Sequence, residues 1–182
     1  MNRIFLTAGH HYSDPGASGN KFTENSLALE FVNLTSSFAR ELCPDIPIWN
    51  DNYLDPLSTV TQQVKSMGTK NDLWIEVHFN AYNGKATGYE ALVSNNAVEF
   101  IKMVAHDLSF IPALLGIPSR GVKREAQSAR GKLGMFNTIV PAVLLEMGFI
   151  DNEADMNKWK EKRVDVAKAL AIYLVNLYKS KR

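Results

Sequence analysis

The chain has 182 residues, of which 46% are hydrophobic, so it is long and apolar enough to fold as one domain with a sizeable core. Its 20 lysines and arginines nearly balance its 19 acidic residues, and the formal net charge is +1. No basic run indicates a nucleic-acid partner, and no apolar run is long enough to cross a membrane. The single cysteine, Cys43, excludes an intrachain disulfide and a structural zinc site built on several thiolates.

The N-terminus carries no recognisable secretory signal. After Arg3, the apolar run covers only residues 4–8 before Gly9, which is too short for the hydrophobic part of a signal peptide. We therefore expect cytoplasmic synthesis. Export would follow a route that needs no such signal, unless a leader has been removed from the chain.

The first 42 residues predict a strand, a loop and a helix. An apolar run at residues 4–6 indicates a buried strand, which leads into a loop rich in glycine, serine, aspartate and proline at residues 9–20. Hydrophobic residues then recur at helical spacing over residues 24–42 and predict an amphipathic helix. Thr23 is a suitable N-cap for it.

The middle of the chain again predicts strands that alternate with helices. Residues 46–49 predict a strand, and residues 56–67 predict a helix with Pro56 near its first turn. Residues 73–77 are apolar apart from one glutamate and predict a third strand, which ends at His78.

The second half adds two strands and two helices. Residues 88–93 predict a strand, and residues 100–115 predict a helix that Pro112 should break or kink. Residues 140–147 form an apolar strand interrupted by one glutamate, and hydrophobic spacing over residues 164–178 predicts a C-terminal helix.

This order of elements predicts an α/β fold in which residues 1–182 form a single domain around a mostly parallel sheet flanked by helices. In such folds, sites gather at the carboxyl ends of the strands. His10, His78 and Glu146 all fall near predicted strand ends.

Four histidines are present, and they differ in context. His106 lies on a predicted helix but off its apolar stripe, which favours an ordinary solvated residue. His10 and His11 follow the first strand, and His78 ends the third. Taken one at a time, His10 and His78 are equally compatible with hydrogen-bonded histidines that have no catalytic role.

Two glutamates have both structural and functional interpretations. Glu146 interrupts a core strand, where a carboxylate is costly to bury without a partner, so it indicates either a structural salt bridge or a functional group. Glu24 opens a helix, where an acidic residue also favours the helix dipole. Together, His10, Glu24 and His78 would supply two nitrogens and one carboxylate oxygen, a ligand set used by hydrolytic zinc.

The order and context of these residues resemble the zinc-dependent N-acetylmuramoyl-L-alanine amidases of the third amidase family. Gly9-His10 before the turn at residues 14–17 is similar to the first motif of that family. Glu24, opening a leucine- and alanine-rich helix, resembles the second motif. His78 before Phe79-Asn80-Ala81 resembles the third, although Glu76 and Phe79 replace small residues of the family there.

The fourth motif is a proline-led apolar strand that closes on a glutamate, followed by Gly-Phe and an Asn. It is matched by residues 141–152, which contain Glu146, and the Arg-Gly-Val-Lys stretch of the family appears at residues 120–123. The first motif departs from the family in Thr7-Ala8 before Gly9, and in His11-Tyr12 where glycines are usual. The neighbouring His11 therefore also competes for the role of ligand.

The resemblance implies Zn²⁺ held by His10, Glu24 and His78, with Glu146 moving protons. It implies peptidoglycan as substrate, cleaved between the lactyl group of N-acetylmuramic acid and L-alanine. Two alternatives remain: a zinc endopeptidase for another wall peptide bond, and a non-catalytic wall-binding or regulatory domain of the same fold. The expected site of action is the cell wall, after release as a phage lysin, delivery as an effector, or secretion.

Overall fold

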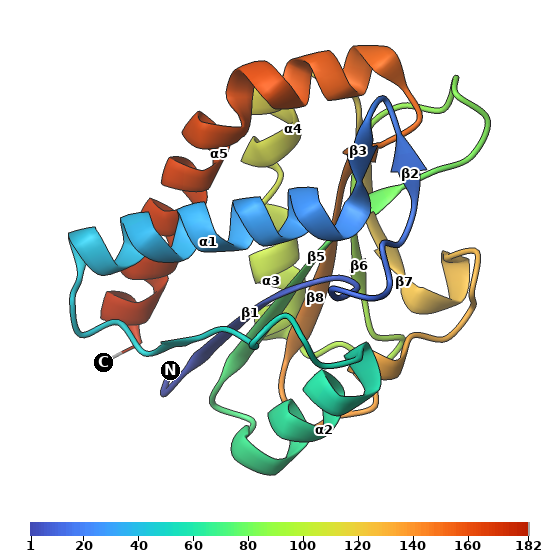
Figure 1. The fold of residues 1–182 in the computed structure, drawn as a ribbon. Helices are drawn as coiled ribbons and strands as arrows, with labels where there is room; N and C mark the ends of the chain where they lie inside the picture. The colour runs from blue at the N-terminus through green and yellow to red at the C-terminus, as the bar shows by residue number, and fades with distance from the viewer. Residues whose placement is uncertain (182) are drawn as a thin grey trace.

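A six-stranded sheet, covered by helices on both faces, forms the centre of the computed structural model, which describes residues 1–181 (Figure 1). The strands are β1 (Ile4–Ala8), β2 (Ser18–Gly19), β3 (Phe22–Thr23), β4 (Ile48–Trp49), β5 (Leu73–Asn80), β6 (Tyr89–Val93), β7 (Ser119–Arg124) and β8 (Ala142–Phe149). The helices are α1 (Glu24–Leu42), α2 (Leu57–Met67), α3 (Glu99–Asp107), α4 (Phe110–Leu115) and α5 (Glu153–Ser180), with 3-10 turns η1 (Glu125–Gln127) and η2 (Gly134–Phe136).

The strand order is β4-β1-β5-β8-β6-β7, and β2 and β3 form a separate hairpin. Neighbouring strands in the large sheet are parallel, except β6 and β8, which are antiparallel. The predicted α/β fold with a mostly parallel sheet is therefore confirmed. None of the described helices is long and apolar enough to span a lipid bilayer.

Each face of the sheet has its own core. Helices α1 and α5 cover one face and α2 lies on the other, as Figure 1 shows. The larger core joins alternate residues of the central strands to these long helices, and the smaller core includes Val60 and Val64 of α2 with Met135 of η2. Met135 of this smaller core and Leu144 of β8 also line a cavity that opens on the same side of the sheet.

Alternation along the strands decides which residues reach that cavity. Ile75 and Val77 of β5 point into the larger core, whereas Glu76 and His78 line the cavity on the opposite face. Strand β8 pairs with β5 in a register that sets Glu146 directly opposite His78. A glutamate in an apolar strand therefore reaches the cavity, and it does not point into the larger core.

The predicted helix at residues 100–115 is two helices, α3 and α4, which meet at Leu108 and Ser109. Pro112 explains where the break falls. Within a continuous helix, its nitrogen would have to donate to the Leu108 carbonyl, but proline has no N–H and its ring would clash with that oxygen. Pro112 is tolerated in the first turn of α4, because the first helical N–H groups lack intrahelical partners.

Thr23 occupies the predicted N-cap position of α1, but its side chain makes no capping hydrogen bond. Its hydroxyl donates to the Asn25 side chain, 2.6 Å away, and accepts from no backbone N–H of the helix. The first N–H groups of α1 instead donate to the carbonyls of Ala17 and Pro15, at 2.8 and 3.1 Å. These two bonds fix the 9–20 loop to the start of α1.

Several boundaries also differ from the prediction. The strand predicted at 46–49 is only the short edge strand β4, and the edge strand β7 was not predicted because its residues are largely exposed. Helix α5 begins at Glu153, well before residue 164, because the side chain of Asn152 caps it by accepting from Ala154 N and Asp155 N.

Candidate metal centre

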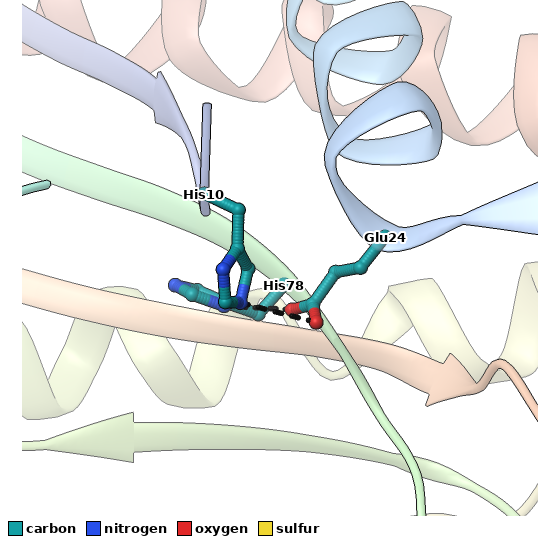
Figure 2. A group of neighbouring side chains, drawn as sticks. All are labelled: His10, Glu24 and His78. Carbon is teal, nitrogen blue, oxygen red and sulfur yellow. Dashed lines mark hydrogen bonds and ion pairs between the residues drawn. The ribbon is translucent and has the colours of Figure 1, made fainter. Parts of the chain in front are cut away.

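His10, Glu24 and His78 meet at the carboxyl edge of the sheet (Figure 2). His10 lies just after β1, Glu24 is the first residue of α1, and His78 is near the end of β5. One potential ligand atom from each residue lies within 4.8 Å of the others. The structure thus brings together the three residues that the sequence predicted as one set, although they are far apart in the chain.

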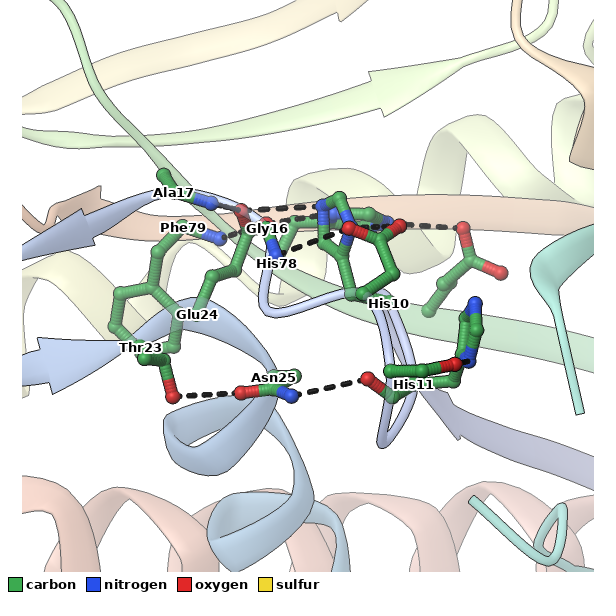
Figure 3. Close-up of polar contacts among 12 residues, drawn as sticks. His10, His11, Gly16, Ala17, Thr23, Glu24, Asn25, His78 and Phe79 are labelled. Carbon is green, nitrogen blue, oxygen red and sulfur yellow. Dashed lines mark hydrogen bonds and ion pairs between the residues drawn. The ribbon is translucent and has the colours of Figure 1, made fainter. Parts of the chain in front are cut away.

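The carboxylate of Glu24 lies between the two histidines and contacts both of them (Figure 3). Its Oε1 lies 2.8 Å from His78 Nδ1 and accepts a hydrogen bond from the Phe79 N–H at 3.0 Å. Its Oε2 lies 3.2 Å from His10 Nε2 and accepts from the Ala17 N–H at 2.9 Å. Each oxygen is therefore positioned by one histidine and one backbone N–H.

The second nitrogen of each histidine faces another carboxylate. His10 Nδ1 lies 2.8 Å from Asp14 Oδ2, and His78 Nε2 lies 3.0 Å from Glu76 Oε1. Metal-binding histidines usually donate their remaining ring N–H to such a group, which fixes the tautomer and the ring orientation. The arrangement offers His10 Nε2, His78 Nδ1 and the Glu24 carboxylate as donors for one divalent ion.

Two glycines make room for these rings. A Cβ atom added to Gly9 would overlap the imidazole of His78. Gly16 has a φ of +66°, which favours glycine, and a Cβ atom there would lie 2.5 Å from His10 Cδ2 and 2.7 Å from Glu24 Oε2. The glycines of the first motif are thus explained by the close packing of the backbone against the cluster.

Electrostatic interactions in the cluster favour its charged forms. Burial opposes ionisation of Glu24, but hydrogen bonds with His10 and His78 hold the pKa of Glu24 well below its usual range. Burial would also lower the pKa of His78, but hydrogen bonds to Glu24 and Glu76 raise that pKa to about 10. The hydrogen bond to Glu24 raises the pKa of His10 as well. Without a metal ion the two histidines therefore hold protons beside the Glu24 carboxylate, and a divalent ion would displace those protons on binding.

Glu146 stands beside the cluster and outside it. It makes no ion pair within residues 1–181, which does not support the structural salt-bridge interpretation, and its buried Oε2 has no hydrogen-bond partner there. Burial raises the pKa of Glu146 to about 7. A carboxyl group with this pKa exchanges protons readily near neutral pH.

The cluster and Glu146 open into a cavity of about 730 Å³. Leu57 and Ser58 of α2 line one part of it, and Arg130 lies on the loop between η1 and η2. Glu90 of β6 lines the wall and forms ion pairs with Arg120 at 2.8 Å and Lys123 at 2.5 Å. The Arg-Gly-Val-Lys stretch noted in the sequence is thus the strand β7, whose two cations neutralise a cavity carboxylate.

The remaining histidines lie outside the cluster. The His11 ring contacts the Ser13 hydroxyl, with 3.3 Å between Nδ1 and Oγ, and its backbone carbonyl accepts from the Asn25 side chain at 3.0 Å. His106 is exposed on α3, as its position off the apolar stripe indicated.

Sequence reasoning assigned no role to two carboxylates of the site, Asp14 and Glu76. The spacing of four residues between His10 and Asp14 was a usable signal in a tight loop. Strand alternation between Glu76 and His78 was another, because residues two apart on a strand lie on the same face.

The chain matches the family described as N-acetylmuramoyl-L-alanine amidase over residues 4–175. The chain belongs to this amidase family. It is 28% identical to the endolysin of Bacillus phage SPP1 over 161 residues, which cover 82% of the chain and 55% of that endolysin. It is 27% identical over 167 residues to a sporulation-specific N-acetylmuramoyl-L-alanine amidase of Bacillus subtilis, covering 88% of the chain and 61% of that amidase.

The fold is also that of solved amidase domains. The catalytic domain of the amidase CwlV from Bacillus (Paenibacillus) polymyxa var. colistinus superposes with a TM-score of 0.81 at 20% identity, with 100% of both chains covered. The catalytic domain of the CD27L endolysin, which targets Clostridia difficile, gives a TM-score of 0.72 at 24% identity, covering 96% of this chain and 97% of that one. The chain therefore has the amidase fold, and it spans 55% and 61% of the two sequence relatives described above.

The first test of the centre is metal content. Purified protein is expected to bind one divalent ion per chain, and His10→Ala or His78→Ala should each lose most of it, because each removes one of three protein donors. Elemental analysis after dialysis measures this. His11→Ala and His106→Ala are the matched controls and should keep the wild-type content. Metal loss in His11→Ala with full occupancy in His10→Ala would move the site to the neighbouring histidine.

The glycine packing gives a second test. Gly9→Ala is expected to weaken metal binding by roughly tenfold or more, because the added methyl group displaces the His78 ring from its position. Titration against a chromophoric chelator measures the affinity. Gly134→Ala is the control, since a Cβ atom there has no neighbour within 4 Å. Equal affinities in the two variants would show that the His78 ring tolerates the shift.

Proposed function

We propose that the chain is a zinc-dependent peptidoglycan amidase that cleaves the bond between the lactyl group of N-acetylmuramic acid and the L-alanine of the stem peptide. The observation that carries the proposal is the cluster of two histidines and one glutamate beside an unpaired, largely buried carboxyl group, Glu146, in an open cavity. The family to which the chain belongs supports the substrate.

The donor set fits zinc. Two imidazole nitrogens and one carboxylate oxygen are ligands that Zn²⁺ accepts in tetrahedral catalytic sites, where a fourth position remains for water or substrate. When bound, zinc supplies Lewis acidity, lowering the pKa of water to about 7 and polarising a carbonyl group. The residues for this role are His10, Glu24 and His78, because one donor atom from each lies within 4.8 Å of the others.

Glu146 is the candidate for proton transfer. Its backbone is paired with that of His78, so its side chain projects from the sheet next to the cluster. In the reaction, Glu146 takes a proton from the attacking water and later gives a proton to the departing amine of L-alanine. A pKa of about 7 suits both steps, because the group must change its protonation state twice in each cycle.

The cavity is compatible with a peptide attached to a sugar. Its volume of about 730 Å³ falls in the range of sites for extended small ligands. Its lining combines carboxylates and histidines with apolar residues such as Leu57 and Leu133. The polar groups would hold the scissile amide, and the apolar residues would contact the stem peptide.

The relatives set the biological context of the proposal. One is the endolysin of a bacteriophage and another is a sporulation-specific amidase. We place the action of this chain at the cell wall, reached by release or delivery, with residues 1–182 as the catalytic domain.

Replacement of Glu146 separates catalysis from metal binding. Glu146→Gln keeps the size of the side chain but has no ionisable group, so the rate should fall by a factor on the order of 10²–10⁴ while the zinc content stays at the wild-type value. Release of dye-labelled peptidoglycan and elemental analysis measure the two quantities. A variant with a near-normal rate would reduce Glu146 to a structural carboxyl group, and a variant that loses zinc would make it a ligand.

The products of digestion identify the bond. We expect new amino termini on L-alanine, muramic acid with a free lactyl carboxylate, and unbroken glycan strands. Mass spectrometry of digested peptidoglycan, with chemical labelling of new amino groups, measures this, and the Glu146→Gln protein is the negative control. New termini inside the stem or cross-bridge would make the chain an endopeptidase, and new reducing sugar ends would contradict both functions.

A further inference from the structure

Glu76 is a buried carboxylate without an evident structural purpose. It lies in the middle of β5, between the apolar residues Ile75 and Val77, and its relative exposure is 2%. Its Oε2 has no hydrogen-bond partner within the described chain. Burying a carboxylate that is only half satisfied costs stability, and an apolar side chain of similar volume is often better tolerated at such a position.

Among residues 1–181, the hydrogen-bond partner of the Glu76 side chain is His78 of the candidate metal centre. Its Oε1 lies 3.0 Å from Nε2 of His78, and the other ring nitrogen, Nδ1, faces Glu24 at 2.8 Å. The neighbours of Glu76 across the sheet do not provide another role. Its partner on β1 is Thr7, whose hydroxyl accepts from the Trp74 indole at 2.9 Å, and its partner on β8 is Leu144.

We propose that Glu76 is a positioning residue for the metal centre: it holds His78 in the tautomer that carries its proton on Nε2 and leaves Nδ1 free to bind the ion. The inference rests on the proposed metal site. It assigns to this chain a specific geometry, in which His78 binds through Nδ1 and His10, whose Nδ1 faces Asp14, binds through Nε2.

Charge balance gives Glu76 a second effect. A divalent ion between neutral histidines has a charge of +2, and Glu24 alone would leave the buried centre with a charge of +1. The Glu76 carboxylate, in contact with His78, brings the sum for the ion, Glu24 and Glu76 to zero whenever the neighbouring Glu146 is protonated. Since an uncompensated buried charge is expensive, the second carboxylate should raise the affinity for the ion. Asp14 is less able to do this, because about half of its side chain is exposed to solvent.

The test compares metal affinities of Glu76 variants. Glu76→Ala removes both the acceptor and the charge, and it should weaken zinc binding by about 10–100-fold, which is typical when such a partner of a ligand is removed. Glu76→Gln keeps an acceptor oxygen for the Nε2 proton but not the charge, and it should lie between wild type and Glu76→Ala. Chelator competition measures all three, and thermal unfolding of the metal-free proteins verifies that they fold.

Asp72→Asn is the matched control. Asp72 is also a buried carboxylate, 3% exposed, and it directly precedes β5, but its partner is Thr69 at the opposite end of the strand. Its replacement is expected to change stability without changing zinc affinity. The positioning role would be overturned if Glu76→Ala bound zinc as tightly as wild type. It would also be overturned if Asp72→Asn weakened zinc binding as much as Glu76→Ala does.

Nitrogen-15 NMR of the histidine rings in the zinc-loaded wild-type protein tests the same inference without any variant. We expect the proton of His78 on Nε2, slow to exchange with water, and none on Nδ1. A proton on Nδ1 with the ion on Nε2 would contradict the proposal even if zinc binds. A protein that binds no zinc would instead contradict the proposed function, so the two failures are distinguishable.

Discussion

The buried carboxylate of Glu24 is the interaction on which the rest of the site depends. It is 4% exposed, and its two oxygens accept N–H groups from Ala17 and Phe79 while facing two histidines. A carboxylate in this position is stable only when it is fully paired. It therefore ties together the loop after β1, the start of α1 and the end of β5, and it lies at the centre of the candidate metal site.

The sheet explains why His78, Glu76 and Glu146 lie next to this point. Parallel pairing of β5 with β8 sets His78 opposite Glu146, and strand alternation directs both, with Glu76, away from the larger core. Helix α2 covers only part of that face, and the cavity forms beside it. The acidic groups in these apolar strands depart from the pattern of the surrounding core, and such departures are expected at functional sites.

The sequence predicted most of this arrangement because its signals were local. Glu24 opens α1 as predicted, and His78 lies near the end of β5, which continues two residues beyond the predicted end, to Asn80. Grouping them with His10 required the resemblance to the order of motifs in the amidase family, because residue spacing alone does not show that His10 and His78 lie close together. The contacts of Glu76 and Asp14 were missed because they depend on ring orientation. Thr23 is the N-cap of α1 as predicted, but the first N–H groups of the helix donate to loop carbonyls and not to its hydroxyl, and the sequence alone does not place those carbonyls.

The most direct test of the account is a crystal structure of the zinc-soaked protein, with anomalous diffraction collected on both sides of the zinc absorption edge. We expect one strong anomalous peak at about 2.0–2.2 Å from His10 Nε2, His78 Nδ1 and a Glu24 oxygen, with Glu146 outside bonding distance of the ion. A peak elsewhere on the chain, or one coordinated by His11 or Glu146 in place of these donors, would contradict the central claim.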